Sequence, residues 1–428
     1  MKTLVFITSH FPYGTGESFI DTEFPRLQQD FNKIVIISQD ISGKLIRNIP
    51  ENIIIKRYDT STSLRGFLHL PFLILKNLRT IKKTYKDEFA FRKKISQSLT
   101  LKQSAYLLKK IIKAIQLRDF IAITLIREDI KGTIVFYSYW LNTGAHAIGF
   151  LNCRESIRIA RAHGSDLYEE NSKLLYLPLL KFSAETLNAI FFVSEHGRKY
   201  LAEKIKTEDH KFILSRLGTE KPNVEQTPAS KTDKFTIVTC SNLVPLKRID
   251  LLIYSLAMLH PKKQVEWLHF GDGILKDELK NLAAKRLGTL NKINNRFMGQ
   301  FSNSELLKYY STHDINLFVN TSSTEGIPVS IMEAQSFGIP VIATNTGGVK
   351  ELVVEGTGTL LPADFHPADL AKYIQYYTEL PEAEMIQVKM NAFNNWSLNF
   401  NATLNYKDFV NKVNSILAPE KNCSDLFL

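Results

Sequence analysis

The chain has 428 residues, which is long for one hydrophobic core, so two domains are expected. Its 44% hydrophobic residues, 20 glycines and 15 prolines are typical of a globular protein, and no apolar run of about eighteen residues predicts a transmembrane helix. Three widely spaced cysteines without a CxxC pair argue against a disulfide framework or a zinc site and favour a reducing cytosol. The formal net charge is +11.

Short apolar runs alternate with helical patterns through the first half of the chain. The opening run is too short for a secretory leader and no small-residue cleavage site follows it, so a buried first strand is favoured. Runs rich in β-branched and aromatic residues, bounded by Gly, Pro, Asn or Ser, predict buried parallel strands. In this half they are Thr3–Ser9, Lys33–Ser38, Asn52–Arg57, Thr133–Tyr139, Ile157–His163 and Ala189–Ser194.

The positive charge is concentrated in residues 67–118. Between Lys76 and Arg118 there are thirteen lysines and arginines but only two acids, Asp87 and Glu88. Apolar residues precede and follow this stretch, and basic helices with apolar stripes favour anionic membrane surfaces. The same spacing fits a solvated helix pair with one face on the core equally well. No aromatic-basic RNA motif or zinc finger occurs, so nucleic acid is not an expected partner.

The second half repeats the alternation after a polar linker. Residues 221–234 contain two prolines, many polar residues and no aromatic residue, which is typical of a linker. The next strands are expected at Phe235–Cys240, Val265–Phe270, Ile315–Val319 and Pro340–Ala343. Asn401 to Leu417 has the apolar spacing of one amphipathic helix, and the residues after Pro419 are expected to form a loose tail.

Strand–helix alternation in both halves predicts an α/β fold with two Rossmann-like doubly wound sheets. The expected domains are residues 1–220 and 235–395. They are joined by the linker 221–234 and followed by a helix and tail at 396–428.

In the first half, candidate site residues follow the carboxyl ends of three expected strands, where ligands of open α/β sheets bind. Gly14 and Gly16 follow the first strand and let the backbone approach a ligand, with a helix expected to begin near Glu17. His163 ends another strand and can donate or accept a hydrogen bond near neutral pH. On the acceptor side we expect Trp140, Asn142 and Asp166.

The second half carries a cation and a glycine turn at equivalent positions. Lys247 lies just past a strand, before a helix expected near Asp250, where it is placed to meet a diphosphate. An exposed Lys-Arg pair would give the same pattern. Gly271 and Gly273 follow the next strand and predict a turn that lets a flat ring lie against the backbone.

The most specific element runs from Val319 to Gly348. A strand leads into a polar loop with Glu325, Gly326 and Ile327, and a helix carrying Glu333 follows. The N-terminus of a helix supplies N–H donors and positive potential for a phosphate, whereas a carboxylate there would repel it. Glu325 is therefore assigned to sugar hydroxyls and Glu333 to a ribose diol, although two ordinary acids would show this spacing as well.

These motifs together resemble glycosyltransferase family 4, whose members are retaining enzymes with the GT-B fold. The resemblance implies that residues 1–220 bind the acceptor and residues 235–395 bind a nucleotide-sugar donor. It also implies that the two domains face each other across a cleft and that the crossover helix in 396–428 returns to the first domain. The resemblance rests on Glu325-Gly-Ile-Pro-(x4)-Glu333-Ala, on Phe337-Gly-Ile-Pro-Val and on Gly347-Gly348. It extends to the loop Ser241 to Lys247, to Gly271 and Gly273, and to His163-Gly-Ser-Asp166. It is weakest over residues 60 to 130, where such enzymes vary and contact the acceptor or a membrane.

The resemblance implies a role for each matching residue. Glu325 and His163 would contact the donor sugar, Glu333 the ribose, and Lys247 the leaving diphosphate, with Gly16 and the backbone of Gly326 and Ile327 near the phosphates. One departure is Asn242, which stands in the donor loop where the family usually has an arginine. Arg248 and Arg216 are the cations proposed to compensate, although neither stands at the matching position.

The implied reaction transfers a hexose from a nucleoside diphosphate-sugar to an acceptor hydroxyl with anomeric retention and without a metal or other cofactor. The implied acceptor is a lipid-linked or saccharide intermediate of exopolysaccharide, capsule or lipopolysaccharide synthesis. The enzyme would be cytoplasmic and peripheral at the inner face of the membrane. Two alternatives share the fold: a sugar phosphorylase or nucleotide-sugar epimerase, and a non-catalytic protein that binds sugar nucleotides.

Overall fold

The computed structural model describes residues 2–14, 17, 19–40, 43–59, 64–153, 156–206, 210–221 and 234–417. Most of the expected linker 221–234, and the expected tail after Pro419, lie outside the described residues. The chain divides into two compact units. The first comprises Met1–Ser215 and Tyr406–Leu428, and the second comprises Arg216–Asn405.

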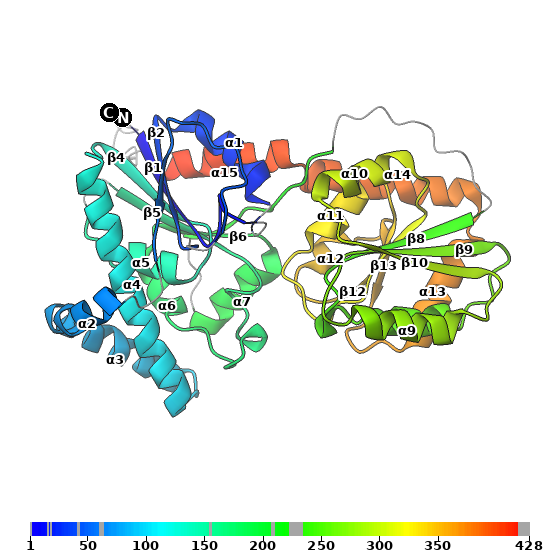
Figure 1. Cartoon of the computed structure of the whole chain (residues 1–428), viewed down its shortest axis with the longest axis horizontal. Helices are drawn as coiled ribbons and strands as arrows, with labels where there is room; N and C mark the ends of the chain where they lie inside the picture. The colour runs from blue at the N-terminus through cyan, green and yellow to red at the C-terminus, as the bar shows by residue number, and fades with distance from the viewer. Residues whose placement is uncertain are drawn as a thin grey trace, which may run out of the picture. The chain divides into compact units, whose positions relative to one another are not determined.

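The first unit is built on a parallel sheet of seven strands (Figure 1). The strand order is β3-β2-β1-β4-β5-β6-β7, with Ile7 of β1 beside Ser138 of β4. The chain therefore builds outward from β1 in one direction and then from β4 in the other. The strands are β1 (Lys2–Thr8), β2 (Lys33–Ser38), β3 (Ile54–Arg57), β4 (Thr133–Ser138), β5 (Ser156–Ala162), β6 (Ala189–Phe192) and β7 (Phe212–Leu214).

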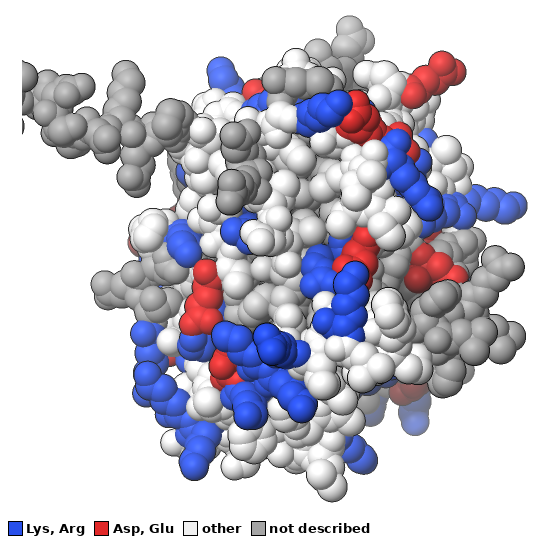
Figure 2. Space-filling view, turned by 90° about the vertical axis from the view of Figure 1, so that its left-hand side faces the viewer, with Lys and Arg blue, Asp and Glu red and all other residues white. Residues whose placement is uncertain are grey.

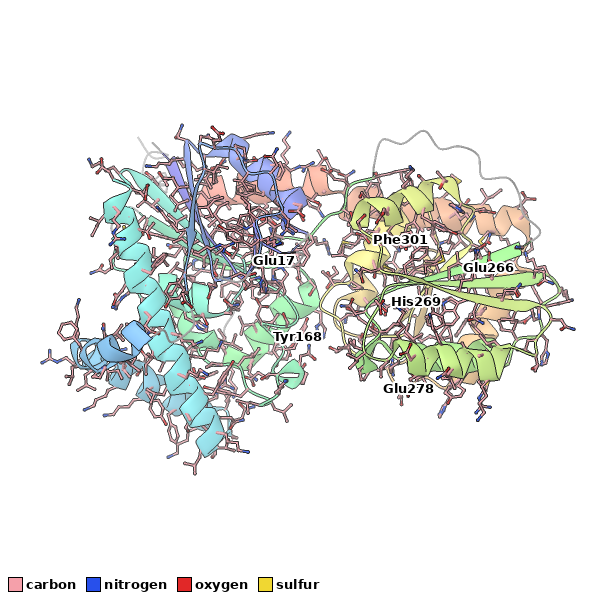
Figure 3. The ribbon with its side chains drawn as sticks, in the orientation of Figure 1. Glu17, Tyr168, Glu266, His269, Glu278 and Phe301 are labelled. Carbon is pink, nitrogen blue, oxygen red and sulfur yellow. The ribbon has the colours of Figure 1, made fainter. Side chains whose placement is uncertain are left out.

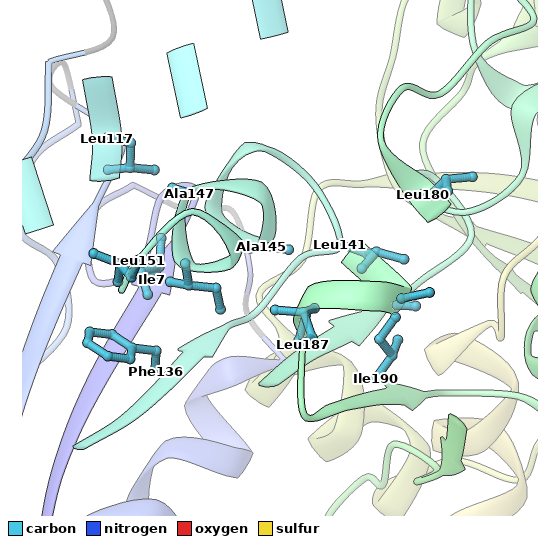
Figure 4. Packing of buried hydrophobic residues seen from close by; sticks show 14 of the residues in the cluster. Ile7, Leu117, Phe136, Leu141, Ala145, Ala147, Leu151, Leu180, Leu187 and Ile190 are labelled. Carbon is cyan, nitrogen blue, oxygen red and sulfur yellow. The ribbon is translucent and has the colours of Figure 1, made fainter. Parts of the chain in front are cut away.

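Alternate residues of each central strand pack into different layers of helices. Val5 and Ile7 of β1 join a core with Leu117, whereas Leu4 and Phe6 join a core on the opposite face. Figure 4 shows the first of these cores, in which Ile7, Phe136 and Leu117 meet the alanines of α5. The helices of this unit are α1 (Ile20–Asp30), α2 (Leu64–Lys76), α3 (Leu78–Lys94), α4 (Leu101–Arg127), α5 (Thr143–Gly149), α6 (Leu180–Thr186) and α7 (Glu195–Ile205).

The long helix α4 begins at a capping box and links the sheet to the basic helices. Thr100 accepts a hydrogen bond from the backbone N–H of Gln103, whose side chain accepts one from the Thr100 N–H. Helix α3 is fixed by the buried guanidinium of Arg92, which pairs with Glu88 at 2.9 Å and with Glu169 at 2.7 Å. A third, smaller core of the first unit contains Ile81 of α3 and Ile111 of α4.

The second unit contains a parallel sheet of six strands in the order β10-β9-β8-β11-β12-β13. The strands are β8 (Lys234–Cys240), β9 (Gln264–Phe270), β10 (Ile293–Gly299), β11 (Leu317–Asn320), β12 (Val341–Thr344) and β13 (Gly358–Leu361). Its helices are α8 (Ile249–Leu256), α9 (Lys276–Leu287), α10 (Asn303–Thr312), α11 (Val329–Ser336), α12 (Val349–Leu352), α13 (Pro367–Glu379) and α14 (Glu382–Asn399). The apolar faces of α8, α9 and α13 cover one side of this sheet, while α10, α11 and α14 lie on the other (Figure 1).

The sequence located every expected strand to within two residues at either end but missed three others. The missed strands are β7, β10 and β13. Strand β10 contains Asn294, Asn295 and Arg296 and forms an edge of its sheet, so burial does not impose an apolar pattern on it. Strands β7 and β13 are short edge strands of three and four residues.

The last helix, α15 (Ala402–Leu417), returns to the first unit as expected. Phe409 and Val413 are buried in the core that contains Phe6 and Phe24. The Phe409 ring lies 5.3 Å from that of Tyr137 and 4.8 Å from that of Phe191, measured between centroids. The first unit therefore depends on residues from the far end of the chain for one of its faces.

Replacing Phe409 by alanine should lower the free energy of unfolding by about 3–5 kcal/mol, because a fully buried aromatic ring leaves a cavity. The measurement is urea unfolding followed by circular dichroism. Leu404 lies on the same helix with 53% of its surface exposed, so Leu404→Ala is the matched control and should change stability by less than about 1 kcal/mol. Equal losses in the two variants would contradict the packing described for α15.

Candidate functional site

Both sheets reverse their strand order at one point, and candidate residues gather beyond the strands that flank it. In the first sheet the reversal lies between β1 and β4, and in the second between β8 and β11. The connections from neighbouring strands leave in opposite directions there and open a crevice at their carboxyl ends. Lys247 follows β8 and Glu325 follows β11, so the topology of the second unit brings these two residues together.

Lys247 and Glu325 form an ion pair between two loops of the second unit. Lys247 Nζ lies 2.6 Å from Glu325 Oε1, and Asn320 Nδ2 donates to the same oxygen at 3.3 Å. The Thr321 hydroxyl donates to the backbone carbonyl of Lys247 at 2.7 Å, which ties the end of β11 to the Lys247 loop. A cation and a carboxylate are thus held side by side, each partly exposed to solvent.

The Glu325 loop is pressed against the glycine pair that follows β12. The Gly348 N–H donates to the Gly326 carbonyl at 2.7 Å. Gly347 has φ +55°, and a Cβ placed on it would lie 1.9 Å from the Glu325 carbonyl oxygen. Only glycine permits this contact, so the Gly-Gly pair sets the position of Glu325.

Gly271 and Gly273 pack against the loop that follows β8. A Cβ on Gly271 would lie 1.9 Å from the Ser241 carbonyl oxygen, and one on Gly273 would lie 2.5 Å from that of Leu243. The Leu243 N–H donates to the Asp272 carbonyl at 2.9 Å. The close approach that glycine allows here is made by the protein's own backbone, and contact with a flat ring stays a prediction.

Helix α11 offers backbone donors beside the ion pair. It begins at Val329, after Gly326 and the buried Ile327, and its cap residue Pro328 makes no side-chain hydrogen bond to the helix. The Ile331 N–H donates to the Pro328 carbonyl at 3.2 Å, which leaves the N–H groups of Val329 and Ser330 and the positive end of the helix dipole for an anion. Glu333 lies one turn further along the same helix.

Glu333 is a buried carboxyl group at the foot of this site. It is 7% exposed, and Oε1 accepts a hydrogen bond from Asn303 Nδ2 at 2.5 Å. Burial raises its pKa to about 7, although the Asn303 hydrogen bond opposes that shift. Burial also raises the pKa of the nearby Cys240 thiol to about 12, with the charge of Glu333 as a further cause. Glu333 is thus a carboxyl group that gains or loses its proton near neutral pH.

The cations suggested as replacements at Asn242 are occupied by protein groups. Arg248 donates to the carbonyls of Thr321, Ser322 and Ala363 at 2.7, 3.3 and 2.8 Å, so it fixes the loops around β11. Arg216 Nη2 lies 3.4 Å from Glu351 Oε2. Asn242 itself is exposed. Within the Ser241 to Arg248 loop, Lys247 is therefore the cation that faces the Glu325 site.

In the first unit, Glu17 closes the end of β1. Its carboxylate accepts hydrogen bonds from the backbone N–H groups of Ser9, His10 and Phe11 and from the indole N–H of Trp140. Figure 3 marks its position. Glu17 adopts φ +59° and α1 begins only at Ile20, so the expected helix start near Glu17 is wrong. Gly14 also has positive φ, +60°, whereas Gly16 lies outside the described residues.

His163 follows β5 and stacks on the aromatic side chains that follow β4. Its ring centroid is 4.5 Å from that of Trp140 and 5.1 Å from that of Tyr139. His163 is buried, and among the described residues neither ring nitrogen has a hydrogen-bond partner. A buried polar group usually has a partner, so an unpaired imidazole at a strand end is a strong candidate for substrate contact.

Asp166 and Asn142 hold the loops around His163 in place. Asp166 accepts from the backbone N–H of His163 at 2.6 Å and from that of Leu141 at 2.7 Å, which joins the ends of β5 and β4. Asn142 Oδ1 accepts from the Gly144 N–H at 3.1 Å and caps α5. The structure thus gathers Trp140, Asn142, His163 and Asp166 at one edge of the first sheet, as the strand pattern predicted.

Three residues with direct roles in this geometry were not among the predicted site residues. Glu17 organises the β1 and β4 ends, Asn320 supports Glu325, and Asn303 supports Glu333. The sequence pattern did give a signal for Asn320, because this residue directly follows the expected strand Ile315–Val319 and is the last residue of β11. No three His, Cys, Asp or Glu side chains gather as a metal site within the residues described.

Comparison with known proteins gives the class to which the second unit is related. Residues 220–392 match the family described as glycosyl transferases group 1. Over 192 residues the chain is 29% identical to the O-antigen biosynthesis glycosyltransferase WbnH of Escherichia coli, which is 44% of this chain and 51% of that protein. It is 28% identical to a GDP-mannose-dependent phosphatidylinositol monomannoside mannosyltransferase of Corynebacterium glutamicum over 38% of this chain and 42% of that protein. The chain spans about half the length of the curated relatives it matches.

Solved structures with the same two-sheet architecture match nearly the whole chain. The lipopolysaccharide outer core galactosyltransferase WaaB aligns with a TM-score of 0.65 over 97% of this chain and 99% of its own, at 12% identity. Anabaena HepE in complex with UDP aligns with a TM-score of 0.63 over 97% and 100%, at 17% identity. The fold is therefore that of GT-B glycosyltransferases, with two parallel Rossmann-like sheets, and the chain is homologous over part of its length to enzymes of O-antigen synthesis.

The raised pKa of Glu333 predicts a pH-dependent stability. Because its folded-state pKa of about 7 lies above the ordinary value of 4.5, the folded chain holds this proton more tightly than the unfolded chain. Stability is therefore fully retained below about pH 4.5 and is lost as the pH rises through 7. Glu333→Gln removes that loss and should raise the free energy of unfolding by about 2–3 kcal/mol at pH 8.

The measurement is thermal and urea unfolding of Glu333→Gln and wild type at pH 5 and pH 8. The two proteins should differ far less at pH 5, where most of the penalty is absent. Glu278→Gln is the matched control, because Glu278 is exposed on α9 of the same unit. A stability difference that does not change between the two pH values would show that burial of Glu333 has no such cost.

Proposed function

We propose that the protein is a retaining glycosyltransferase of family 4 that transfers a hexose from a nucleoside diphosphate-sugar to an acceptor hydroxyl. The observation that carries this proposal is the Lys247–Glu325 pair, held at 2.6 Å beside the uncapped start of α11 at the strand-order reversal of the second sheet. It is supported by the match of this region to glycosyl transferases group 1 and by the UDP complex of the structurally similar HepE.

The donor is assigned to the second unit on chemical grounds. Cleavage of the glycosyl–phosphate bond builds negative charge on the departing diphosphate. Lys247 and the N–H groups at the start of α11 are positioned to stabilise that charge as it develops. Glu325 then accepts hydrogen bonds from the sugar hydroxyls, and Glu333 from the ribose diol. The last role needs the carboxylate form of Glu333, which its pKa of about 7 makes available at neutral pH and above.

His163 is assigned to substrate hydroxyls at the edge of the first unit. Its two unpartnered ring nitrogens can donate one hydrogen bond and accept another, and the rings of Trp140 and Tyr139 fix its plane. No metal or other cofactor is required in this scheme, because Lys247 and the helix dipole supply the positive charge that a divalent cation supplies elsewhere. The diphosphate departs from the same face that the acceptor hydroxyl attacks, and the departing phosphate takes the acceptor proton, so the configuration is retained.

Glu325→Gln and Lys247→Ala should each reduce turnover about 100-fold, because each removes one contact that stabilises the transition state. The assay is release of free nucleoside diphosphate from a panel of UDP- and GDP-sugars. Lys262→Ala serves as the control, since the Lys262 side chain is 84% exposed and forms an ion pair with Glu379 at 3.7 Å, away from Lys247 and Glu325. Normal turnover in both site variants would remove the site assignment, and release of sugar phosphate without nucleotide would indicate a phosphorylase.

We further propose that the enzyme works at the cytoplasmic surface of a membrane on a lipid-linked or polysaccharide intermediate. The similarity to O-antigen enzymes supports this acceptor class. Figure 2 views the first unit from the side of α2 and α3, where lysine and arginine side chains gather over the lower part of the surface. Exposed apolar side chains lie on α2 and at the start of α4, with Phe72 at 69%, Leu75 at 71% and Leu101 at 91% exposure. No helix among the described residues is long and apolar enough to span a bilayer.

Binding to membranes is predicted to depend on the exposed lysines of α3. The triple variant Lys82→Glu, Lys83→Glu and Lys86→Glu should weaken binding to phosphatidylglycerol vesicles at least about 100-fold, because each lysine near an anionic surface contributes about 1 kcal/mol. Vesicle flotation at low salt measures the bound fraction. Reversing Lys280, Lys285 and Arg286 on α9 changes the net charge equally and should leave binding intact. Absence of flotation by wild type would end the membrane proposal without touching the donor site.

A further inference from the structure

A pocket of about 340 Å³ lies within the first unit, beyond the ends of β1 and β4. Its walls combine the predicted acceptor residues Trp140, Asn142 and Asp166 with two residues that the motif comparison did not include, Lys110 and His146. Pockets for small molecules occupy about 300–1,000 Å³, so this one suits a single sugar with one substituent. Trp140, Leu177 and Pro178 are among the apolar residues of the wall.

Lys110 brings an unpaired positive charge to this pocket. It lies on α4, and its contacts are the Thr143 hydroxyl at 3.4 Å from Nζ and the face of the Tyr106 ring at 5.4 Å. No carboxylate lies within ion-pair distance of Nζ among the described residues. Burial lowers the pKa of Lys110, and the neighbouring Lys109 lowers it further. A partly buried ammonium without a counter-ion is costly, and a negatively charged ligand would remove that cost.

His146 adds an unused hydrogen-bonding group next to this charge. It lies on α5 between Ala145 and Ala147, whose packing is visible in Figure 4. Only 3% of its surface is exposed, and within the described part of the chain neither ring nitrogen has a partner. Burial lowers the pKa of His146 to about 3, with Lys110 as the second cause. The ring is therefore neutral, and one nitrogen carries an N–H that can donate to a ligand.

The acid in the wall does not neutralise Lys110. Asp166 uses its two oxygens to accept backbone N–H groups from His163 and Leu141. His10, which also lines the pocket, has Nδ1 at 3.1 Å from Asp40 and an exposed ring. The inner part of the pocket thus has an ammonium and an imidazole donor without an opposing free carboxylate.

We propose that this pocket binds the anionic group of the acceptor, a phosphate or a sugar carboxylate, with Lys110 as its counter-ion and His146 as a hydrogen-bond donor. That the bound anion belongs to an acceptor rests on the proposed glycosyltransferase function. Binding of an anion in this pocket does not depend on the donor site. A sugar carried by that group stacks against Trp140. The substrate class is then an anionic saccharide or a sugar joined through phosphate, in preference to a neutral one.

The test is binding of three small probes to the full-length chain, measured by calorimetry at low salt: glucose 1-phosphate, glucuronate and methyl glucoside. Titrations are made in the Lys247→Ala background, so that phosphate binding by the second unit does not contribute. At least one anionic probe should bind about 10-fold or more tightly than methyl glucoside, since a charged hydrogen bond contributes about 1.5–3 kcal/mol. A preference for glucose 1-phosphate indicates a phosphate-linked acceptor, and a preference for glucuronate indicates a uronic acid.

Lys110→Met should abolish the preference for the anionic probe, whereas Lys109→Met, one residue away and exposed, should change it less than about twofold. Lys110→Arg keeps the charge and should retain most of the preference, which separates loss of charge from loss of folding. If Lys110→Met unfolds, Lys110→Gln and the salt dependence of binding by the Lys247→Ala protein give the same information. Equal binding of all three probes by the Lys247→Ala protein, or an unchanged preference when folded Lys110→Met is combined with Lys247→Ala, overturns the inference.

An assay of donor hydrolysis by the wild-type protein distinguishes failure of this inference from failure of the proposed function. If nucleotide sugars are hydrolysed but anion binding does not depend on Lys110, the anion pocket is wrong and the transferase assignment stands. If no donor is hydrolysed while Lys110-dependent binding is found, the transferase assignment is wrong and the pocket stands.

Discussion

A parallel sheet ends all its strands at one edge, and reversal of the strand order leaves one place at that edge where the connecting loops diverge. Both sheets of this chain obey that constraint, with reversals between β1 and β4 and between β8 and β11. Residues 78 positions apart in the sequence, Lys247 and Glu325, come to 2.6 Å because each follows one of the two central strands. The first unit uses the same rule to bring Glu17, Trp140 and His163 together.

The sequence predicted the strands that burial makes apolar and the residues that follow them. Apolar runs such as Lys33–Ser38 have a clear signal because both faces of a central parallel strand are covered. Edge strands have no such requirement, and β10 with its two asparagines was missed for that reason. Element boundaries and the loops that carry Glu325 and Lys247 followed from the same pattern.

Side-chain partners could not be predicted in the same way. Lys110 is one of thirteen basic residues spread between Lys76 and Arg118, and nothing in its spacing separates it from the exposed Lys109. Arg248 was proposed as a substitute cation although it does not stand at the matching position, and its guanidinium binds three backbone carbonyls. Glu17 was placed at a helix start, whereas it has a left-handed backbone and binds the N–H groups at the end of β1. Such pairings depend on loop conformations, which local sequence patterns specify poorly.

The return of α15 has a consequence for how the chain folds during synthesis. The ribosome releases residues 1–215 first, but one face of their sheet is completed by Phe409 and Val413. Residues 216–405 need no later segment for their core and can fold before that face is covered. During synthesis the second unit can therefore complete its core before the first unit does. The first unit keeps an apolar face exposed to chaperones until α15 emerges from the ribosome.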